Sequence, residues 1–383
     1  MFAEDLRERR GLLRERIAGR RVLVIGGAGT IGSSFIRALL PYAPSALVVV
    51  DVDENGLAEL TRDLRSRHGL TVPADYRTYP ISFASPVFDR LLDDEPRFEI
   101  VANFAAHKHV RSEKDRYAIE AMIHNNVIAA ERLLARLRQR LPERFFCVST
   151  DKAANPVNVM GASKKLMEEV ILAYADDMPV TTARFANVAF SNGSLLYGFH
   201  ERIMRRQPLT APSDVRRYFV SPEESGQLCL LACVCGEPGD IFYPRLSERQ
   251  MTTFSTIADA YLRARGLAVE QHPTPHDARA AAERWIAGAP YPVHYFETDT
   301  SGEKSYEEFF TEEEIRDETT FRQLGVIRNA PRLSLAQARD HIAKLQAVFE
   351  RRDVSKAEII TTLEELLPGF DHHETGKSLD QKM

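Results

Sequence analysis

The most constraining feature of the sequence is a short apolar run that leads into a glycine-rich turn and then a helical pattern. Arg21 to Ile25 (RVLVI) is typical of a strand buried on both faces. Gly26, Gly29 and Gly32 follow with the spacing G-x-x-G-x-x-G, ahead of the helix. Glycines at these places permit a tight turn and a close approach of the backbone to a pyrophosphate, which the helix N-terminus would bind. The order of elements therefore predicts a dinucleotide-binding βαβ unit.

A second apolar strand, residues 46–50, ends in Asp51. An acidic side chain at this place accepts hydrogen bonds from the hydroxyls of the adenosine ribose. Asp51, with Asp53 and Glu54 nearby, would repel a 2′-phosphate, so the pattern favours NAD over NADP. The alternative is a plain βαβ unit in which an Asp caps the next helix. The cofactor-binding residues predicted in this unit are Gly26, Gly29, Thr30, Ile31, Gly32 and Asp51.

Strand and helix patterns alternate through residues 21–190, with further strands expected at 76–81, 99–105, 145–148 and 180–185. This alternation predicts an α/β fold, a Rossmann-like doubly wound parallel sheet with a smaller C-terminal α/β substrate-binding region. The expected domains are an N-terminal helix at 1–20, an NAD-binding domain at 21–190, a substrate region at 191–330 that is partly interleaved with it, and C-terminal helices with a tail at 331–383.

The strand at 99–105 is followed by small and then basic residues. Ala105 and Ala106 would let the backbone pass close to the cofactor. Lys108 and His109 are expected on the substrate side. His107 and His109 form an isolated H-x-H without a third ligand at a recognisable spacing, so no metal site is predicted.

Composition excludes several classes of partner. The net charge is −5 and the pI about 6.2, which is no argument for nucleic acid or an anionic membrane as partner. No apolar run is long enough for a transmembrane helix, and the charged N-terminus lacks the apolar core of a secretory signal. The 4 cysteines form no disulfide framework, so we expect a cytoplasmic protein.

Helical patterns at 112–138 and 157–175 carry more apolar residues than packing on one sheet face requires. We expect them to pair across a two-fold axis as a four-helix bundle, which would give a homodimer or a larger assembly.

The candidate chemistry lies where the apolar strand 145–148 stops in polar residues. Thr150, Asp151 and Lys152 follow it, and a helical pattern containing Met160 and Lys164 comes next. Open α/β sheets present reactive groups at the carboxyl ends of their strands in this way. A structural ion pair between Asp151 and Lys152 is the alternative interpretation.

Together these motifs resemble the extended short-chain dehydrogenase/reductases, and within them the nucleotide-sugar 4,6-dehydratases that act on UDP-N-acetylhexosamines in bacterial polysaccharide assembly. The segments that carry the resemblance are GGAGTIG at 26–32, NFAAHKHV at 103–110, STDKAANPVNVMGASKK at 149–165, RFANVAFSNGS at 184–194, RRYF at 216–219 and GEKSYEE at 302–308.

The resemblance implies a lyase with tightly bound NAD that is regenerated in each turnover. It implies that Lys164 binds the nicotinamide ribose and that Thr150, Asp151 and Lys152 form the reacting group. The residues expected to bind substrate are Lys108, His109, Asn126, Asn187, Arg217, Glu303 and Lys304.

Three positions depart from the family pattern. Met160 stands where most members have Tyr, and a thioether cannot transfer a proton. Met at this position matches a branch that is usually fused to membrane-spanning segments and retains the configuration at C5. Ser82 replaces an adenine-contacting Asp and Thr300 replaces an Arg, which leaves a GDP-linked sugar open beside UDP-GlcNAc.

The resemblance also suggests separate catalytic roles for the residues at the end of the strand 145–148. Oxidation of C4 makes the C5 proton acidic, after which a base and an acid must act together. We expect Asp151 to be the acid at the C6 hydroxyl and Lys152 the neutral base at C5, because burial disfavours both charged forms. Thr150 by relay, Lys152 or water could accept the C4 hydroxyl proton. The competing functions are a sugar-nucleotide epimerase or oxidoreductase of the same fold and a non-catalytic NAD-binding relative.

Overall fold

Residues 1–109, 113, 115–298, 306, 308–328 and 330–372 are described by the computed structural model of the chain. They divide into two units, each of which is assembled from separate stretches of sequence. Unit 1 comprises residues 1–185, 223–245 and 308–372, and unit 2 comprises residues 186–222 together with the described part of 246–307.

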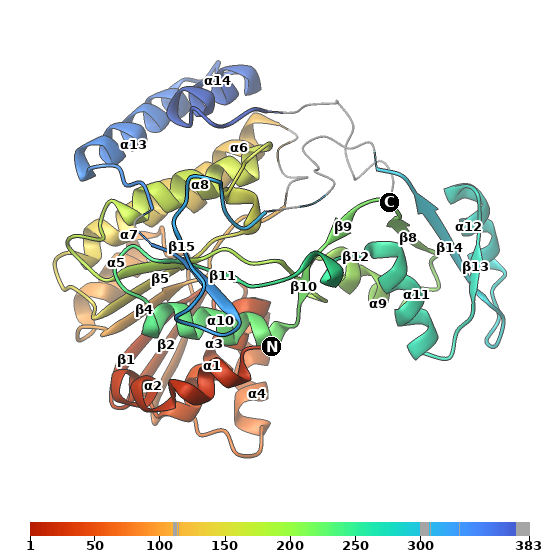
Figure 1. Cartoon of the computed structure of the whole chain (residues 1–383), viewed down its shortest axis with the longest axis horizontal. Coiled ribbons are helices and arrows are strands. Elements are labelled where there is room, and N and C mark those ends of the chain that lie inside the picture. The colour runs from red at the N-terminus through yellow and green to blue at the C-terminus, as the bar shows by residue number, and fades with distance from the viewer. Residues whose placement is uncertain (110–112, 114, 299–305, 307, 329, 373–383) are drawn as a thin grey trace. The chain divides into compact units, whose positions relative to one another are not determined.

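Unit 1 is built on a sheet whose nine strands, among the described residues, have the order β15-β16-β11-β6-β5-β4-β1-β2-β3 (Figure 1). The strands from β11 to β3 are parallel, whereas β16 is antiparallel to both β11 and β15. The predicted doubly wound parallel sheet is confirmed. The strands are β1 (Arg21–Ile25), β2 (Ala46–Asp51), β3 (Asp75–Pro80), β4 (Ile100–Asn103), β5 (Arg144–Val148), β6 (Val180–Ala183), β11 (Ile241–Pro244), β15 (Arg316–Asp317) and β16 (Leu324–Ile327).

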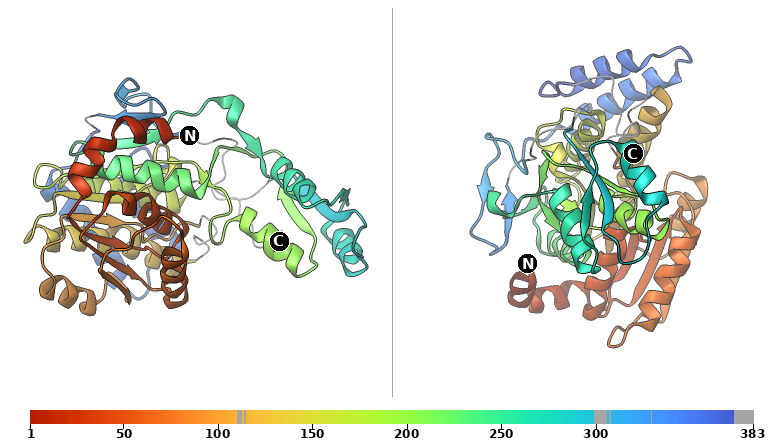
Figure 2. Two further views of the ribbon diagram at one scale, coloured as in Figure 1. Left: turned by 90° about the horizontal axis from the view of Figure 1, so that it is seen from below. Right: turned by 90° about the vertical axis from the view of Figure 1, so that its right-hand side faces the viewer.

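Helices cover both faces of this sheet (Figures 1 and 2). Side chains at three helix starts, Asp53, Ser85 and Asn158, accept hydrogen bonds from the first helical turn and so fix where those helices begin. One face carries α3 (Thr30–Leu39), α4 (Glu54–Ser66) and α10 (Pro222–Cys235). The other carries α5 (Pro86–Asp94), α6 (Arg116–Ile123), a π-helical segment (His124–Ile128), α7 (Ala129–Leu137) and α8 (Val159–Leu172).

The N-terminal stretch forms two short helices, α1 (Ala3–Glu8) and α2 (Arg10–Ile17), where the sequence suggests one. Asp5 is fully buried and accepts hydrogen bonds from the backbone N–H groups of Arg322 and Gln323, just before β16. Arg16 donates to the Val234 carbonyl on α10. The N-terminal helices are therefore fastened to the main sheet and to the helices on one of its faces.

The C-terminal helices α13 (Leu335–Glu350) and α14 (Lys356–Leu366) lie over α6 and α8 (Figure 1). Ile342 and Leu345 of α13 and Ile359 and Leu363 of α14 share one buried apolar cluster with side chains of α6 and α8, including Leu166. The four-helix bundle between two copies was predicted from the apolar surface of these helices. That surface is covered by α13 and α14 of the same chain. The sequence argument missed this because it counted apolar residues without identifying what covers them.

The predicted domain boundary at 190 also differs from the structure. β11, β16 and β15 belong to the main sheet, although they fall in the stretch expected to form the substrate region. They are short strands, and two of their pairings are antiparallel, so they interrupt the strand–helix alternation that marks a parallel sheet.

Unit 2 contains a small parallel sheet in the order β13-β14-β8, with α9, α11 and α12 beside it. Short pairs β7–β10 and β9–β12 complete it. Its elements are β7 (Asn187–Val188), α9 (Leu195–Met204), β8 (Leu209–Pro212), β9 (Arg216–Arg217), β10 (Phe219–Val220), β12 (Thr252–Thr253), α11 (Phe254–Ala264), β13 (Val269–Gln271), α12 (Pro275–Glu283) and β14 (Tyr291–Phe296).

Candidate active site

The carboxyl ends of the central strands of unit 1 are aligned. Ile25 of β1 pairs with Asn103 of β4, and Asn103 pairs with Cys147 of β5. The glycine turn after β1, the segment after β4 and the polar residues after β5 therefore leave the sheet at one edge. This is the edge at which open α/β sheets bind their ligands.

The glycine turn is shaped by close backbone contacts. Gly26 has φ +75°, and a Cβ on it would lie 2.5 Å from the backbone nitrogen of Ala105, at the end of β4. A Cβ on Gly32 would lie 2.3 Å from the Gly26 carbonyl oxygen. Helix α3 has Gly29 as its N-cap, which supplies no capping side chain. The turn thus has the build of a pyrophosphate cradle, since bulkier residues would displace β4 or α3.

Asp51 ends β2 beside this turn. Its Oδ2 accepts a hydrogen bond from the backbone N–H of Ala28 at 2.9 Å, and its Oδ1 accepts one from Asp53 at 3.0 Å. The carboxylate is therefore held at the rim of the glycine turn, where the resemblance expects contact with a ribose. Ser82, which replaces an Asp of the family, is used locally: its Oγ accepts from the backbone of Ala84.

Asn126, one of the residues expected to bind substrate, is buried in unit 1. It lies in the π-helical segment and is only 2% exposed. Its Oδ1 accepts from the backbone N–H of His107 at 2.8 Å, and its Nδ2 donates to the His107 carbonyl at 2.9 Å and to Ser163 at 3.0 Å. The amide is fully engaged in holding the segment after β4 against α8. Asn126 thus positions that segment within unit 1.

The segment after β4 presents its side chains at the same edge. Desolvation lowers the pKa of Lys108, although the amine remains accessible to solvent. Desolvation and the charge of Lys164 lower the pKa of His107, which therefore favours the neutral imidazole. Ala105 and Ala106, expected to contact a cofactor, are half-buried beside Gly26.

Thr150, Asp151 and Lys152 form a hydrogen-bonded group at the end of β5, where Asp151–Ala153 is a turn of 3₁₀ helix. Oδ1 of Asp151 accepts from the Thr150 hydroxyl at 2.8 Å, from the Lys152 backbone at 2.9 Å and from Lys152 Nζ at 3.1 Å. The side chains of Asp151 and Lys152 are 3% and 16% exposed. A carboxylate, an amine and a hydroxyl are therefore concentrated in a largely desolvated place.

Helix α8 carries Lys164 and Met160, the first among polar partners and the second among apolar ones. Lys164 is buried and donates from Nζ to the Val148 carbonyl at 3.1 Å, and desolvation lowers the pKa of its amine. Met160 is 3% exposed and belongs to the apolar cluster that α13 and α14 complete. The side chain at the position of the family's Tyr is therefore part of the core.

Asn187 and Arg217 lie close together in unit 2. The Asn187 backbone N–H donates to the Tyr218 carbonyl, adjacent to Arg217, at 3.2 Å. Within the described residues, Nδ2 of Asn187 is buried without a hydrogen-bond partner. A buried unpaired donor is costly unless a ligand satisfies it. Glu303, Lys304 and the departing residue Thr300 lie outside the described residues.

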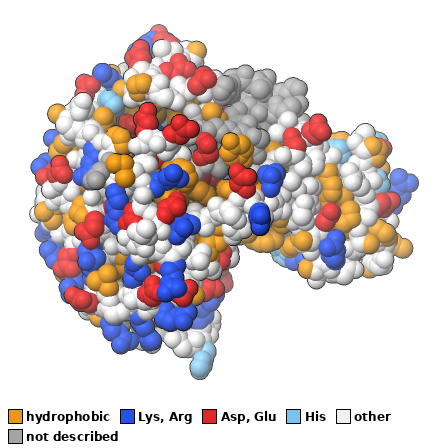
Figure 3. Space-filling model, viewed as in Figure 1, with side chains coloured by type: hydrophobic (Ala, Val, Ile, Leu, Met, Phe, Trp, Pro, Cys, Tyr) orange, Lys and Arg blue, Asp and Glu red, His pale blue; other side chains and the backbone are white. Residues whose placement is uncertain are grey.

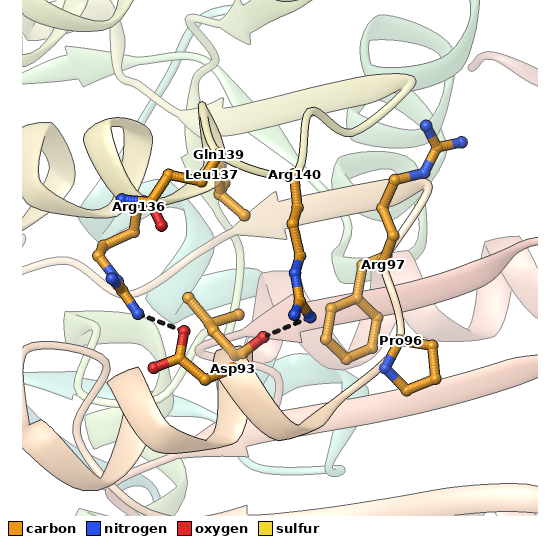
Figure 4. A pocket seen from close by; sticks show the side chains of 9 residues that line it. Asp93, Pro96, Arg97, Arg136, Leu137, Gln139 and Arg140 are labelled. Carbon is orange, nitrogen blue, oxygen red and sulfur yellow. Dashed lines mark hydrogen bonds and ion pairs between the residues drawn. The ribbon is translucent and has the colours of Figure 1, made fainter.

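One further surface feature of unit 1 is a pocket whose charged side chains are occupied. A pocket between α5 and α7 is lined by arginines that are already paired, since Arg136 reaches Asp93 at 2.6 Å and Arg140 donates to the Leu92 carbonyl at 3.4 Å (Figure 4). On the face shown in Figure 3, acidic and basic side chains are interspersed over this unit. Among the described residues no group of His, Cys, Asp and Glu could hold a metal ion, and no helix has the length and apolarity to cross a membrane.

The comparison with protein families decides the relationship. The model of the family described as "Polysaccharide biosynthesis protein" matches residues 22–329. The chain belongs to this family. The resemblance drawn from the motifs alone, to proteins of bacterial polysaccharide assembly, is thereby confirmed.

Relatives within the polysaccharide biosynthesis family differ in length. An uncharacterized membrane protein of Methanocaldococcus jannaschii, MJ1061, is 31% identical over 77% of this chain and 82% of its own length. The probable polysaccharide biosynthesis protein EpsC of Bacillus subtilis is 27% identical over 85% of this chain and 51% of its own. The capsular polysaccharide biosynthesis protein CapD of Staphylococcus aureus is 29% identical over 60% of this chain and 39% of its own length. The chain thus spans about half of EpsC and less of CapD.

Solved structures share the fold at lower identity. Pen from Bacillus thuringiensis superposes with a TM-score of 0.66 at 19% identity, covering 86% of this chain and 98% of that one. A double mutant of DesIV, the dTDP-glucose 4,6-dehydratase of Streptomyces venezuelae solved with NAD and DAU bound, gives 0.59 at 18% identity, covering 85% and 97%. These likenesses establish the fold of the family member described here.

Proposed function

We propose that the chain is an NAD-dependent nucleotide-sugar 4,6-dehydratase that acts on UDP-GlcNAc and retains the configuration at C5. The observation that carries this proposal is the group formed by Thr150, Asp151 and Lys152 at the end of β5. It offers an acid, a base and a hydroxyl relay in one turn, while Met160 leaves no Tyr for proton transfer.

The residues at the sheet edge fit a bound dinucleotide. A Cβ on Gly26 or Gly32 would collide with the Ala105 nitrogen or the Gly26 carbonyl, so the two glycines keep the turn tight, and Asp51 sits at its rim. Lys164 is positioned by the Val148 carbonyl on the strand that carries the reacting group. Bound NAD⁺ would supply the oxidant for C4 and return the hydride to C6 later in the turnover.

The C4 hydroxyl proton has a route to Asp151. Thr150 donates its hydroxyl hydrogen to Asp151 Oδ1 at 2.8 Å, so a proton leaving C4 can pass through that hydroxyl to the carboxylate. Asp151 thereby becomes the acid that the next step needs. The relay removes the need for a strongly basic Thr150, because the hydroxyl gains one proton as it loses another.

Elimination then uses both members of the pair. The cycle starts from ionised Asp151 and neutral Lys152. Lys152 takes the C5 proton, and Asp151 gives the proton that it received from C4 to the C6 hydroxyl, which leaves as water. Lys152 finally returns its proton to C5, which restores both groups to their starting states. A base that removes and replaces the proton from one side retains the configuration at C5.

Two residues of unit 2 suit the diphosphate of the sugar nucleotide. Nδ2 of Asn187 is a buried donor without a partner among the described residues, and the neighbouring Arg217 adds a positive charge. A phosphate oxygen accepts hydrogen bonds from both kinds of donor.

Mass spectrometry of reactions with UDP-GlcNAc tests this function. The purified protein with NAD⁺ should form a UDP-linked product lighter by one water, and in deuterated water the C5 proton should exchange with retention. A GDP-linked sugar should not react. A product of unchanged mass would favour an epimerase, and no product with either sugar would refute the dehydratase.

A further inference from the structure

Four charged side chains are buried together beneath the candidate active site, and three of them have no place in the mechanism above. Arg184, after β6, is 0% exposed. Its guanidinium donates to both carboxylate oxygens of Glu168 and of Glu314, at distances from 2.7 to 3.2 Å, and to the Phe309 carbonyl at 3.1 Å. These contacts occupy all the N–H donors of the group.

Glu168 connects this arginine to the site. It follows Lys164 by one helical turn on α8, and its Oε1 accepts a hydrogen bond of 2.6 Å from the Ser149 hydroxyl. Ser149 immediately precedes Thr150, the start of the reacting group. One carboxylate thus contacts the end of β5 and the buried arginine, while its charge also acts on Lys164.

The charges of the four side chains cancel only when all are present. Arg184 alone would neutralise Glu168 and leave the buried amine of Lys164 without a compensating charge. Glu314 adds a second carboxylate to Arg184, so the cluster of two cations and two anions is neutral as a whole. Buried charges persist only when they are balanced in this way.

Other titratable groups near Lys164 do not supply that negative charge. Burial raises the pKa of the Cys147 thiol on β5 to about 11, so the thiol is protonated at neutral pH. His107, after β4, is held towards its neutral form by desolvation and by Lys164 itself. Of the described groups that act on the charge of Lys164, Glu168 is therefore the one that is anionic at neutral pH.

We propose that Glu314 is a positioning residue for Lys164: by sharing Arg184 it frees the charge of Glu168 to keep the Lys164 amine protonated for the cofactor. The part of this inference that concerns the cofactor rests on the proposed function. Because Phe309 is bonded to the same arginine and Glu308 to Asn155, the segment 308–314 is also tied to the turn that follows the reacting group.

The titration of Lys164 tests this directly, without any ligand. In protein with isotope-labelled lysine, with the signal assigned by Lys164→Arg, the amine of Glu314→Gln should titrate about one pH unit or more below that of the wild type. As pH rises, NAD⁺ affinity should fall at a correspondingly lower pH in Glu314→Gln, and it should be about fivefold weaker than in the wild type at the pH where the wild-type amine is half protonated. Glu314→Asp keeps the negative charge. In this variant the Lys164 titration and the NAD⁺ affinity should both return most of the way to their wild-type values.

Glu318→Gln is the matched control, because Glu318 is a more exposed carboxylate of the same hairpin that bonds Tyr243 rather than Arg184. Circular dichroism checks that each variant is folded. An unchanged Lys164 titration in folded Glu314→Gln, or equal shifts in the Gln and Asp variants, would overturn the positioning role. Wild-type protein that binds no NAD⁺ at any pH would instead refute the cofactor assignment, while the amine titration still decides the role of Glu314.

Discussion

Nζ of Lys152 lies 3.1 Å from Oδ1 of Asp151, the same oxygen that accepts the Thr150 hydroxyl at 2.8 Å. One carboxylate oxygen therefore links the candidate base to the candidate relay. A proton that enters through Thr150 arrives on the carboxyl group that must donate it at C6, which is why the order of the three residues matters to the proposed cycle.

Removing either member of the pair should abolish most of the activity. We expect Asp151→Asn and Lys152→Ala each to lower kcat for dehydration by about 10²–10⁴-fold, the usual contribution of a general acid or base. Mass spectrometry of the sugar product measures the rate. Asp176→Asn, at a carboxylate 96% exposed, and Lys165→Ala on α8 are the controls and should stay near wild type. Near-full activity in both site variants would show that the pair is only a structural salt bridge.

Restoring the family's Tyr should not restore its function. Met160 is enclosed in the cluster beneath α13 and α14, so the larger ring of Met160→Tyr must be accommodated in a packed core. We expect a loss of about 1–3 kcal/mol in the free energy of unfolding and no gain in kcat, whereas Met160→Leu should lose less than about 1.5 kcal/mol. Urea unfolding and product assays measure the two effects. A faster Tyr variant would mean that this side chain reaches the reacting group.

Asn187 should contribute to substrate binding rather than to the chemical step. Its unpaired Nδ2 gains a partner if a phosphate oxygen binds there. Asn187→Ala should raise KM for the sugar nucleotide by about 10–100-fold, from the roughly 1.5–3 kcal/mol of a hydrogen bond to a charged group, with kcat little changed. Steady-state kinetics with Asn192→Ala as control distinguish the site from its loop. An unchanged KM would remove Asn187 from the binding site.

The stability of the protein should depend on pH through Glu169. Desolvation raises the pKa of this carboxyl group from 4.5 to about 7. The unfolded chain loses this proton first as pH rises, so the contribution of Glu169 to stability is fully present below pH 4.5 and is lost as pH rises to 7. Glu169→Gln should therefore raise the free energy of unfolding by about 1–3 kcal/mol above pH 7 and leave it unchanged near pH 4.5. Denaturant titrations at both pH values measure the free energy of unfolding, with Glu365→Gln at an exposed position as control. Equal changes in the two variants would contradict the role of Glu169.

The C-terminal helices should stabilise the main unit strongly. Leu363 of α14 is 0% exposed in the cluster shared with α6 and α8. Leu363→Ala should cost about 2–5 kcal/mol, as large-to-small core substitutions do. Leu141→Ala, at a position 41% exposed, should change stability by less than about 0.5 kcal/mol. Urea unfolding compares them. A small loss at Leu363 would show that α14 is only loosely attached.

The sequence predicts the central sheet well because its strands are buried on both faces and therefore appear in the sequence as apolar runs. β2 and β5, expected at 46–50 and 145–148, each differ by one residue from the observed Ala46–Asp51 and Arg144–Val148. The strands β15 and β16 could not be found in this way, since they are short and pair antiparallel at an edge. Helix α12 had a readable signal that was not used: Thr274 caps it and Pro275 is its first residue.

The site was predictable where its residues adjoin a strand end and unpredictable where they meet across the fold. Thr150, Asp151 and Lys152 are consecutive, so their proximity follows from the sequence. The link from Arg184 to Glu314 does not, because it depends on how the hairpin of β15 and β16 is placed beside β11. The bonds of Asn126 are a second example, since its amide holds the backbone of His107, which lies 19 residues away in the chain.

The cover that α13 and α14 place over α6 and α8 has a consequence for biosynthesis. Residues 335–366 emerge from the ribosome long after α8, at Val159–Leu172, has been made. Until they arrive, the helix that bears Lys164 has an apolar face open to solvent, and partly made chains expose such faces to aggregation. During synthesis this apolar face therefore stays uncovered until α13 and α14 have been made and can pack against it.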